Sequence, residues 1–368
     1  MITINSNNAA KMAQNILNSN QLQLTGNMKQ LSTGLRINSA ADDAAGLQIA
    51  NRMQTQMQGL AVAQRNSSDA ISMAQTAEAG MSESTNIMNR VRDLAMQSFN
   101  DTNKQEDREA TQKEVEHLKE EINRIANTTN FAGINLLDGT SEHLEFQIGE
   151  TAGDTITFGI DSVTGADLGS EVREATIPAS FDDEGVLDAD LALRFDGANE
   201  TIAKDPGPKH ISDVAEELNE LLGDYDIEAE AVYSINPFAL EIVGHEDDVD
   251  LVRNSAGGVL AGNNLSVDSI NVETQAGATK AMIILDEALA QLDDQRADLG
   301  AVQNRLESTI NNLTSMEENL GISQSRIQDA DFAEQTVDMT SNQMLLQAGV
   351  SVLAQAKGMP QYASMLLP

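Results

Sequence analysis

Cysteine and tryptophan are both absent from this 368-residue chain, which has only 3 tyrosines and 8 phenylalanines. Without cysteine there are no disulfides, so the chain must be held together by packing alone. With so few aromatic rings we do not expect a large aromatic core. Leucine, isoleucine, valine, methionine and alanine must fill the interior instead, which suits helical bundles. The length allows two or three domains.

Long apolar runs are also missing. No stretch approaches the ~18 residues that a membrane span needs. The first residues, MITINSNNAAKMAQNIL, lack the basic and the continuous apolar regions of a cleavable signal peptide. We therefore expect a protein that is not inserted in a bilayer. The net charge of −36 argues against nucleic acid as a partner, because phosphate binding depends on clustered lysine and arginine.

Acidic residues are unevenly distributed along the chain. None precedes Asp42 and none follows Asp338, so both ends are free of negative side chains. Residues 150–275 are the opposite, with 29 acidic and only 5 basic side chains. The charge pattern therefore divides the chain into two acid-free ends and a strongly acidic middle.

Leucine recurs at every seventh residue in the C-terminal third, a period that predicts a helix with a coiled-coil seam. The six positions are Leu285, Leu292, Leu299, Leu306, Leu313 and Leu320. A second ladder comprises Phe332, Met339, Leu346 and Leu353, with a companion row at Thr336, Gln343 and Val350. Between the ladders, a break is indicated by Gly321, Ser323, Gln324 and Ser325. The N-terminus has its own ladder at Leu17, Leu24 and Leu31, with Met28 and Leu35 interleaved.

Two further helices are predicted after the N-terminal one. Residues 43–99 and 104–127 both carry apolar stripes at helical spacing, and Ser39, Asp42 or Asp43 can cap the first. The leucines of 285–320 are expected to pack on these two helices of the same chain. The period changes at HLEFQIGETAGDTITFGI, where apolar and polar residues alternate around a turn, as in a β-hairpin.

The acidic middle mixes strand-like pieces at 189–195, 225–233 and 238–244 with a helix at 211–223. We therefore expect a mainly α protein with an α+β insert. Its parts are a long antiparallel helical bundle or coiled coil formed by both termini, a β-hairpin region and one outer α+β domain. The expected domains are 1–42 with 324–368, 43–175 with 272–323, and 176–271.

Several stretches of the chain carry specific motifs: the N-terminal 53 residues, followed by QRNSSDAISMAQTAEAGMSE, MNRVRDLAMQ and NTTNFAGINLLDG. These stretches resemble bacterial flagellin, the first almost from end to end. Near the other end, GAVQNRLESTINNL and SRIQDADFAEQTVDMTSNQMLLQAGVSVLAQAKGMPQYASMLL also match. The resemblance covers about 1–165 and 275–367. The order of pieces in the middle resembles a small module found in some flagellins and hook-associated proteins.

The resemblance implies a structural subunit that self-assembles into the helical flagellar filament for swimming motility. Such a chain is exported by the flagellar type III system and is extracellular. Its terminal segments are disordered in the monomer and become paired helices of the filament core. That role explains the acid-free ends, because unpaired charge is costly where many copies pack closely. The residues expected to assemble are Leu17, Leu24, Met28, Leu31, Leu35, Phe332, Met339, Leu346, Val350 and Leu353.

The resemblance also implies partners besides other copies of the chain. These are an export chaperone on the C-terminal segment, the filament cap and the hook–filament junction proteins. By matched position, Arg90, Leu94 and Glu114 would form a surface read by an animal toll-like receptor. The alternative is a purely structural role, in which Arg90 and Glu114 make ordinary contacts between subunits. A membrane or nucleic-acid partner is not expected.

Four alternatives come from other interpretations of the same residues. A hook–filament junction protein shares the terminal helices but closes a ring instead of building a fibre. A parallel dimeric zipper or a secreted coiled-coil adhesin would also use the leucine seam. An enzyme displayed on the filament would need the zinc motif H-E-x-x-H, but His245 and Glu246 are followed by Val249 at the second histidine position. With four histidines and no cysteine, we expect no catalysis, no metal and no cofactor.

Overall fold

The computed structural model describes residues 7–177, 191–195, 198–202, 210–224, 227, 229–235, 238–245, 249, 252–254 and 262–365. The chain forms two compact units, each assembled from separate parts of the sequence. The terminal unit comprises residues 1–65, 148–154 and 309–368, and the insert unit comprises residues 66–147 and 155–308.

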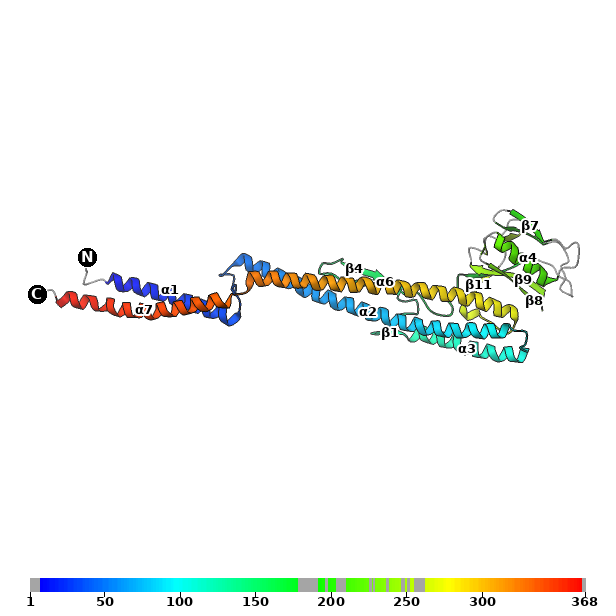
Figure 1. The fold of residues 1–368 in the computed structure, drawn as a ribbon, viewed down its shortest axis with the longest axis horizontal. Helices are drawn as coiled ribbons and strands as arrows, with labels where there is room; N and C mark the ends of the chain where they lie inside the picture. Colours follow the sequence, from blue (N-terminus) through cyan, green and yellow to red (C-terminus); the bar gives the residue numbers. More distant parts are fainter. Residues whose placement is uncertain are drawn as a thin grey trace. The chain divides into compact units, whose positions relative to one another are not determined.

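In the terminal unit, α1 (Asn8–Thr33) and α7 (Phe332–Met365) lie side by side in antiparallel directions (Figure 1). Helix α1 begins at Asn7, whose side-chain oxygen accepts from the amide of Ala10 at 2.9 Å. It ends at Gly34, whose φ of 74° is a left-handed conformation that glycine adopts without strain. Just beyond, Leu35 forms a bridge with Asp329. The turn that follows α1 and the turn that precedes α7 are therefore bonded to each other at this corner.

Two long helices continue from this corner. Helix α2 (Ala44–Phe99) follows the N-terminal side, and α6 (Gln275–Gln328) precedes α7. Within the terminal unit, Leu60 and Ala63 of α2 form a buried cluster with Leu313 of α6, against which Leu320 packs. The pair is held by burial of apolar side chains.

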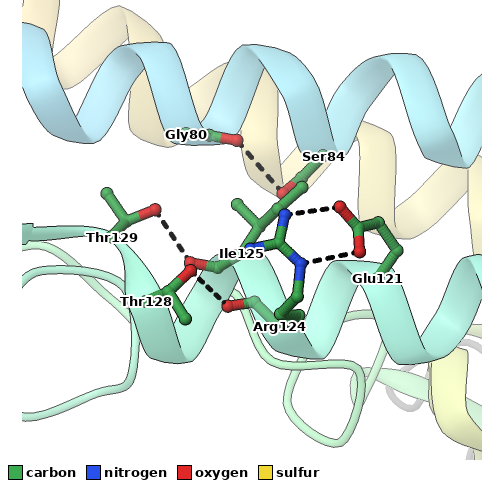
Figure 2. Close-up of polar contacts among 7 residues, drawn as sticks. All are labelled: Gly80, Ser84, Glu121, Arg124, Ile125, Thr128 and Thr129. Atoms are coloured by element: carbon green, nitrogen blue, oxygen red, sulfur yellow. Dashed lines mark hydrogen bonds and ion pairs between the residues drawn. The ribbon is translucent and has the colours of Figure 1, made fainter.

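In the insert unit, α3 (Gln105–Thr128) follows α2 after a short connection. Figure 2 shows how α3 ends: the hydroxyls of Thr128 and Thr129 donate to the carbonyls of Arg124 and Ile125, at 2.7 and 2.8 Å. The carbonyl of Ile125 also accepts from the backbone amide of Thr129 at 3.0 Å, so the hydroxyl bonds add to the backbone bonds of this helix end. In the same view, Arg124 forms a bidentate ion pair with Glu121.

Two small hairpins follow α3. Strands β1 (Asn130–Phe131) and β2 (Ile134–Asn135) are joined by Ala132 and Gly133, both with positive φ. Two positive φ values are what the tight two-residue turn of a hairpin needs. Strands β3 (Leu144–Gln147) and β4 (Thr155–Phe158) form the hairpin expected from the alternating sequence, and Phe146 stacks on Phe158.

The α+β insert contains a four-stranded antiparallel sheet in the order β11-β5-β9-β8. Its strands are β5 (Val172–Thr176), β8 (Ala229–Ile235), β9 (Phe238–His245) and β11 (Gly262–Asn264). A three-stranded sheet has the order β10-β6-β7, from β6 (Leu191–Phe195), β7 (Ala198–Ile202) and β10 (Val252–Asn254). The short 3-10 helix η1 (Val267–Ser269) leads back toward α6.

The core of the insert lies between these sheets and α4 (Ile211–Asp224). Helix α4 contributes Val214, Ala215, Leu218 and Leu222, which recur at 3.6-residue spacing on one face. Leu240 and Ile242 of β9 and Leu191 and Leu193 of β6 complete the cluster. The insert therefore has its own apolar core.

The expected fold class is confirmed: the chain is mainly helical, its two ends form an antiparallel pair, and an α+β insert lies between them. The predicted helices at 43–99, 104–127 and 211–223 differ from α2, α3 and α4 by at most one residue at each end. Parts of the predicted strands, such as 189–190 and 225–226, lie outside the described residues. The insert sheet begins at Val172, slightly before the expected boundary at 176. The three expected domains as a whole remain a prediction.

The predicted helix break at Gly321 and Ser323–Ser325 is wrong, because α6 continues to Gln328. The polar side chains are satisfied without a break. Ser323 donates to the carbonyl of Asn319 at 2.7 Å, one helical turn earlier, and Gln324 donates to Gln54 Oε1 at 3.1 Å. The chain turns instead at Asp329–Asp331, where Ala330 donates to the carbonyl of Gly34 at 3.0 Å.

Candidate functional site: the paired terminal helices and the root of the insert

The contact between α1 and α7 is a narrow seam of half-buried side chains at alternating spacings of three and four residues. On α1 it comprises Ala10, Ala13, Leu17, Asn20, Leu24, Asn27 and Leu31, and on α7 it comprises Gln335, Met339, Asn342, Leu346, Gly349, Leu353 and Ala356. The predicted leucine and methionine rows therefore face each other within one chain. The spacing is that of a two-stranded coiled coil.

Two contacts set the register of this pair. A Cβ atom placed on Gly349 would lie 2.8 Å from Cδ2 of Leu17, so Leu17 packs directly over the glycine backbone. At the end of the pair, Asn7 donates from Nδ2 to the carbonyl of Ala356 at 2.7 Å. The first contact requires a residue without a side chain, and the second requires a side-chain amide.

The companion row on α7 differs from the prediction. Thr336, Gln343 and Val350 are exposed, and the half-buried positions are Gln335, Asn342 and Gly349, one residue earlier. The interleaved positions of the seam are therefore polar or small. Of the residues expected to assemble, Met28, Phe332 and Val350 are exposed and lie outside the seam within the chain.

Large apolar side chains are exposed on both helices of the pair. Among the residues whose burial the structure describes, ten are more than half exposed: Met12, Ile16, Leu22 and Met28 on α1, and Phe332, Val337, Met344, Leu345, Val350 and Val352 on α7. Helix α1 has no fully buried residue at all. An isolated helical pair with so much apolar surface in water is poorly stabilised, because it loses conformational entropy without burying an adequate core. So many exposed large apolar side chains on one pair of helices indicate an interaction site.

The leucine seam of α6 is buried within the chain. Leu285, Leu292, Leu299, Leu306 and Leu313 are all at most 5% exposed, and Leu320 is half-buried. Within the insert unit, Arg92 of α2 forms an ion pair with Asp286 of α6 across this pair, at 2.6 Å between Nε and Oδ1. The seam therefore has partners in its own chain and does not need a second chain.

The expected receptor surface is only partly at the surface. Arg90 Nη2 lies 2.7 Å from Glu114 Oε1, and both side chains are about half exposed, so α2 and α3 present them together. Leu94 is only 3% exposed. It lies beside Val91 and Ala95 on the buried face of α2, so it cannot be a surface contact in this conformation.

The root of the insert is fixed by polar contacts that the sequence did not indicate. Lys119 of α3 donates from Nζ to the carbonyls of Asp268 and Ile270, at 2.8 and 3.2 Å. Asn123 donates to Asp268 Oδ1 at 3.0 Å and accepts from the amide of Gly165 at 2.9 Å. One side chain therefore connects the segment that enters the insert with the segment that leaves it.

Two buried side chains bond to Val272, in the segment that connects η1 to α6. Gln112 Oε1 accepts from the amide of Val272 at 2.8 Å, and Ser98 donates from its hydroxyl to the carbonyl of Val272. Both polar groups of one buried backbone unit are thus satisfied by side chains of α2 and α3, as burial requires. Neither side chain had a sequence pattern that could have identified it.

Lys280 near the start of α6 contacts two carboxylates of the insert sheet. Its Nζ lies 2.7 Å from Glu174 Oε1 of β5 and also donates to Glu241 of β9. The strand register explains the arrangement: Glu174 is opposite Val243, two residues beyond Glu241, so both carboxylates lie on one face of the sheet. The three side chains are each about 20–24% exposed.

The two carboxylates of this cluster have opposite pKa shifts. Burial raises the pKa of Glu241, with the neighbouring Glu174 adding to the effect and Lys280 only partly opposing it. Burial is also the largest single effect on Glu174 and raises its pKa, but the hydrogen bonds with Lys280 and Glu241 and the charge of Lys280 together outweigh it, so the pKa of that carboxyl is lowered. Burial alone would lower the pKa of Lys280, but the two carboxylates raise it. One ammonium therefore holds two acidic groups, and the insert is attached to α6 by charge.

Neither a metal cluster nor a membrane span is found in the part of the chain that the structure describes. No group of three histidine, aspartate or glutamate side chains is placed to hold an ion there. Within the same residues, no helix combines the length and apolar character needed to cross a bilayer. Glu246 of the incomplete zinc motif lies outside the described residues.

These features define a class of protein: a helical assembly subunit, with paired terminal helices that expose apolar side chains and an α+β domain inserted between them in the sequence. The family follows from comparison with known proteins. The model of the bacterial flagellin N-terminal helical region matches residues 4–142, and that of the C-terminal helical region matches residues 282–367. Flagellin A of Vibrio cholerae is 41% identical over 379 residues, covering 100% of this chain and 99% of that protein.

A second relative gives the same result: polar flagellin F of Vibrio parahaemolyticus is 42% identical over 376 residues, again covering 100% of this chain and 99% of that protein. The chain therefore belongs to the bacterial flagellin family, and it is a structural subunit of the flagellar filament. The alternative of a hook–filament junction protein is weaker, because these relatives match along the whole chain and are named flagellins.

Two solved structures resemble the chain in fold. The structure of FliC from Burkholderia pseudomallei is 24% identical with a TM-score of 0.41, covering 64% of this chain and 99% of that one. Flagellar hook-associated protein-3 from Legionella pneumophila is 15% identical with a TM-score of 0.47, covering 75% of this chain and 98% of that one. At such scores neither structure distinguishes a filament subunit from a junction protein, so the distinction rests on sequence identity.

Proposed function

We propose that the filament assembles by burying the exposed faces of α1 and α7 against the same helices of neighbouring copies. The observation that carries this proposal is the set of ten exposed large apolar side chains on these two helices. Burying a Leu- or Met-sized side chain contributes roughly 1.5–3 kcal/mol. A few such contacts per subunit therefore outweigh the entropy lost when the chain joins a filament.

The composition of the same helices supports close packing of many copies. Helix α1 contains two lysines and no acidic residue, and α7 has none after Asp338. Unpaired carboxylates at subunit contacts would oppose assembly, because burying an uncompensated charge is costly. The acidic insert does not share this constraint, so we assign it to the solvent-facing part of the subunit.

The seam between α1 and α7 buries little apolar surface, as expected if these helices fold only when the subunit assembles. The seam of α1 and α7 includes Asn20, Asn27 and Gln335, which contribute little apolar burial within one chain. We infer that the pair is only marginally helical in the free subunit and becomes stable when its outer faces are covered. A chain with unstructured ends also suits type III export, and the exposed apolar face of α7 suits an export chaperone.

Seeded polymerisation tests the proposal. The full chain and a version trimmed to residues 36–328, which lacks α1 and α7, would be added to short seeds and followed by light scattering and electron microscopy. We expect long filaments from the full chain and none from the trimmed one. Filaments from the trimmed chain would overturn the proposal, and a full chain that never elongates its own seeds would favour a junction protein.

The remaining partners are proposed on the same basis. The filament cap and the junction proteins would contact the terminal helices, since these carry the exposed apolar surface. Arg90 and Glu114 form an exposed ion-paired surface that an animal toll-like receptor could read. No catalytic activity is proposed, because the family is structural and the described residues offer no constellation for it.

A further inference from the structure

The edge of the insert sheet borders a large open cavity. Strand β8 is the last strand of the four-stranded sheet, and among the described strands it pairs with β9 alone. Four consecutive residues of β8, Glu230 to Tyr233, line a cavity of about 1000 Å³. Because successive side chains point to opposite faces, a cavity lined by all four lies along the strand edge and not over one face.

The backbone of β8 offers hydrogen-bonding groups on this side. The amide of Ala231 donates to Asn219 Oδ1 of α4 at 2.6 Å, so it points away from β9. In an antiparallel pair the same orientation recurs at every second residue. The amide and carbonyl of Tyr233 therefore also point outward, where an added strand would bond them. The outward amides of Ala229 and Ala231 are already bonded, to the carbonyl of Ile227 and to Asn219, so the edge is open to strand pairing around Tyr233.

The other walls of the cavity determine what fits. The ends of α2 and α3 and the start of α6 contribute Met96, Phe99, Asp101, Arg108 and Glu273. Met96 and Phe99 are about half exposed, and together with Tyr233 they offer apolar and aromatic surface. The four acidic residues of the lining, Asp101, Glu216, Glu230 and Glu273, outnumber the one cation, Arg108. The lining is complementary to a positively charged ligand with apolar side chains.

Arg108 provides a further sign that the cavity is incomplete without an occupant. It is only 8% exposed, it donates from Nη2 to the carbonyl of Asn100 at 3.3 Å, and its buried Nη1 has no hydrogen-bond partner. Buried guanidinium N–H groups are seldom left without an acceptor, because an unsatisfied buried donor costs free energy. Because Nη1 itself is inaccessible in this conformation, a backbone carbonyl of a bound peptide would reach it only after the Arg108 side chain turns toward the cavity.

We propose that this groove is a docking site for an extended peptide segment of another protein, rich in lysine or arginine, which adds a strand to the edge of β8. Main-chain bonds to Tyr233 give affinity, and the acidic lining selects the charge, as in other cases of strand addition. A second copy of this chain is a poor occupant, because its net charge of −36 opposes approach to an acidic groove. The site is independent of the terminal helices.

A binding assay with the full chain tests this proposal. The probe is a fluorescein-labelled eight-residue peptide of alternating lysine and valine, measured by fluorescence anisotropy at low and high salt. Two further peptides serve as controls: one with glutamate in place of lysine, and one with alternate backbone nitrogens methylated. We expect binding of the first peptide, at least tenfold weaker binding of the methylated peptide, and no binding of the acidic one.

Variants of the chain locate the site. The double variant Glu216→Gln/Glu230→Gln removes two charges of the lining, and we expect it to weaken binding at least fivefold. Glu220→Gln makes the same change on α4 outside the cavity lining, so it should alter binding less than twofold. Both variants keep the buried core unchanged, and circular dichroism would confirm folding. Equal binding by the methylated peptide, equal losses in both variants, or no binding at all would overturn the proposal.

Discussion

Leu17 of α1 packs over Gly349 of α7 so closely that a Cβ atom on the glycine would lie 2.8 Å from Cδ2 and 3.2 Å from Cγ of the leucine. A side chain at position 349 would require the Leu17 side chain to shift within the seam, so this contact favours the observed antiparallel register. The contact couples a position on each end of the chain, although the two are far apart in sequence.

Gly349→Ala should weaken the pair despite the better helix propensity of alanine. The substitution gains up to about 1 kcal/mol of propensity, whereas overpacking costs about 1–3 kcal/mol. We expect a net loss of filament stability, measured as a higher critical concentration for polymerisation. Adding Leu17→Ala to Gly349→Ala should cost less than the sum of the two single changes. Strict additivity in this double-mutant cycle would show that the two residues do not couple.

Lys280→Met should destabilise the insert, most strongly near neutral pH. It leaves Glu174 and Glu241 facing each other without a cation, and hydrogen bonds to charged groups contribute about 1.5–3 kcal/mol. Because the pKa of Glu241 is already raised above its usual value of 4.5, mild acid protonates it and relieves the repulsion. Calorimetry should therefore show a larger loss at about pH 7 than at about pH 5.

In the unmodified chain, Lys280 and Glu174 make the stability of the fold depend on pH in opposite directions. The raised pKa of Lys280 means that its contribution is complete below its usual value of 10.5 and is lost as the pH rises through the folded value. The lowered pKa of Glu174 means that its contribution is present above 4.5 and is lost in stronger acid. Equal destabilisation by Lys280→Met at both pH values would contradict this account.

Leu94→Ala should reduce the unfolding free energy far more than Arg90→Ala, because Leu94 is buried and Arg90 is exposed. Leu94 is buried, so its truncation should cost about 2–5 kcal/mol of unfolding free energy. Arg90 forms an exposed ion pair with Glu114, which contributes at most about 1 kcal/mol. Urea unfolding followed by circular dichroism would measure both. A small effect of Leu94→Ala would mean that the residue is accessible after all.

Gln112→Ala should loosen the root of the insert. It leaves the buried amide of Val272 without an acceptor, at a cost of about 1–3 kcal/mol. Gln75→Ala, an exposed position on α2, is the matched control and should change stability by less than about 0.5 kcal/mol. Hydrogen exchange at Val272 should accelerate only in Gln112→Ala. Unchanged protection there would show that the amide of Val272 does not depend on Gln112.

Periodicity predicted the helices of this fold because their apolar stripes are long and regular. The ladder from Leu285 to Leu313 is buried as expected. The same reasoning failed at Gly321, where polar residues that usually end a helix bond instead to the helix backbone and to Gln54 of α2. The proposed receptor contact of Leu94 came instead from matched position in the family resemblance, which does not tell which face of α2 is buried.

The root of the insert could not be predicted at all. Lys119, Asn123 and Gln112 act through backbone groups of residues about 40–160 positions away. Such contacts depend on the tertiary arrangement and carry no local pattern. Likewise, the cluster of Lys280 with Glu174 and Glu241 follows from strand register, which an acidic, irregular sequence does not specify in advance.

The central claim is that the exposed apolar faces of α1 and α7 drive polymerisation. The most direct test compares the critical concentration of the full chain with that of Leu22→Gln and Val337→Gln, whose native side chains are both 68% exposed. Gln23→Ala, also exposed on α1, is the control. We expect each apolar-to-polar change to raise the critical concentration about tenfold, equivalent to about 1.4 kcal/mol, and the control to leave it unchanged. Unaltered polymerisation in both variants would contradict the account.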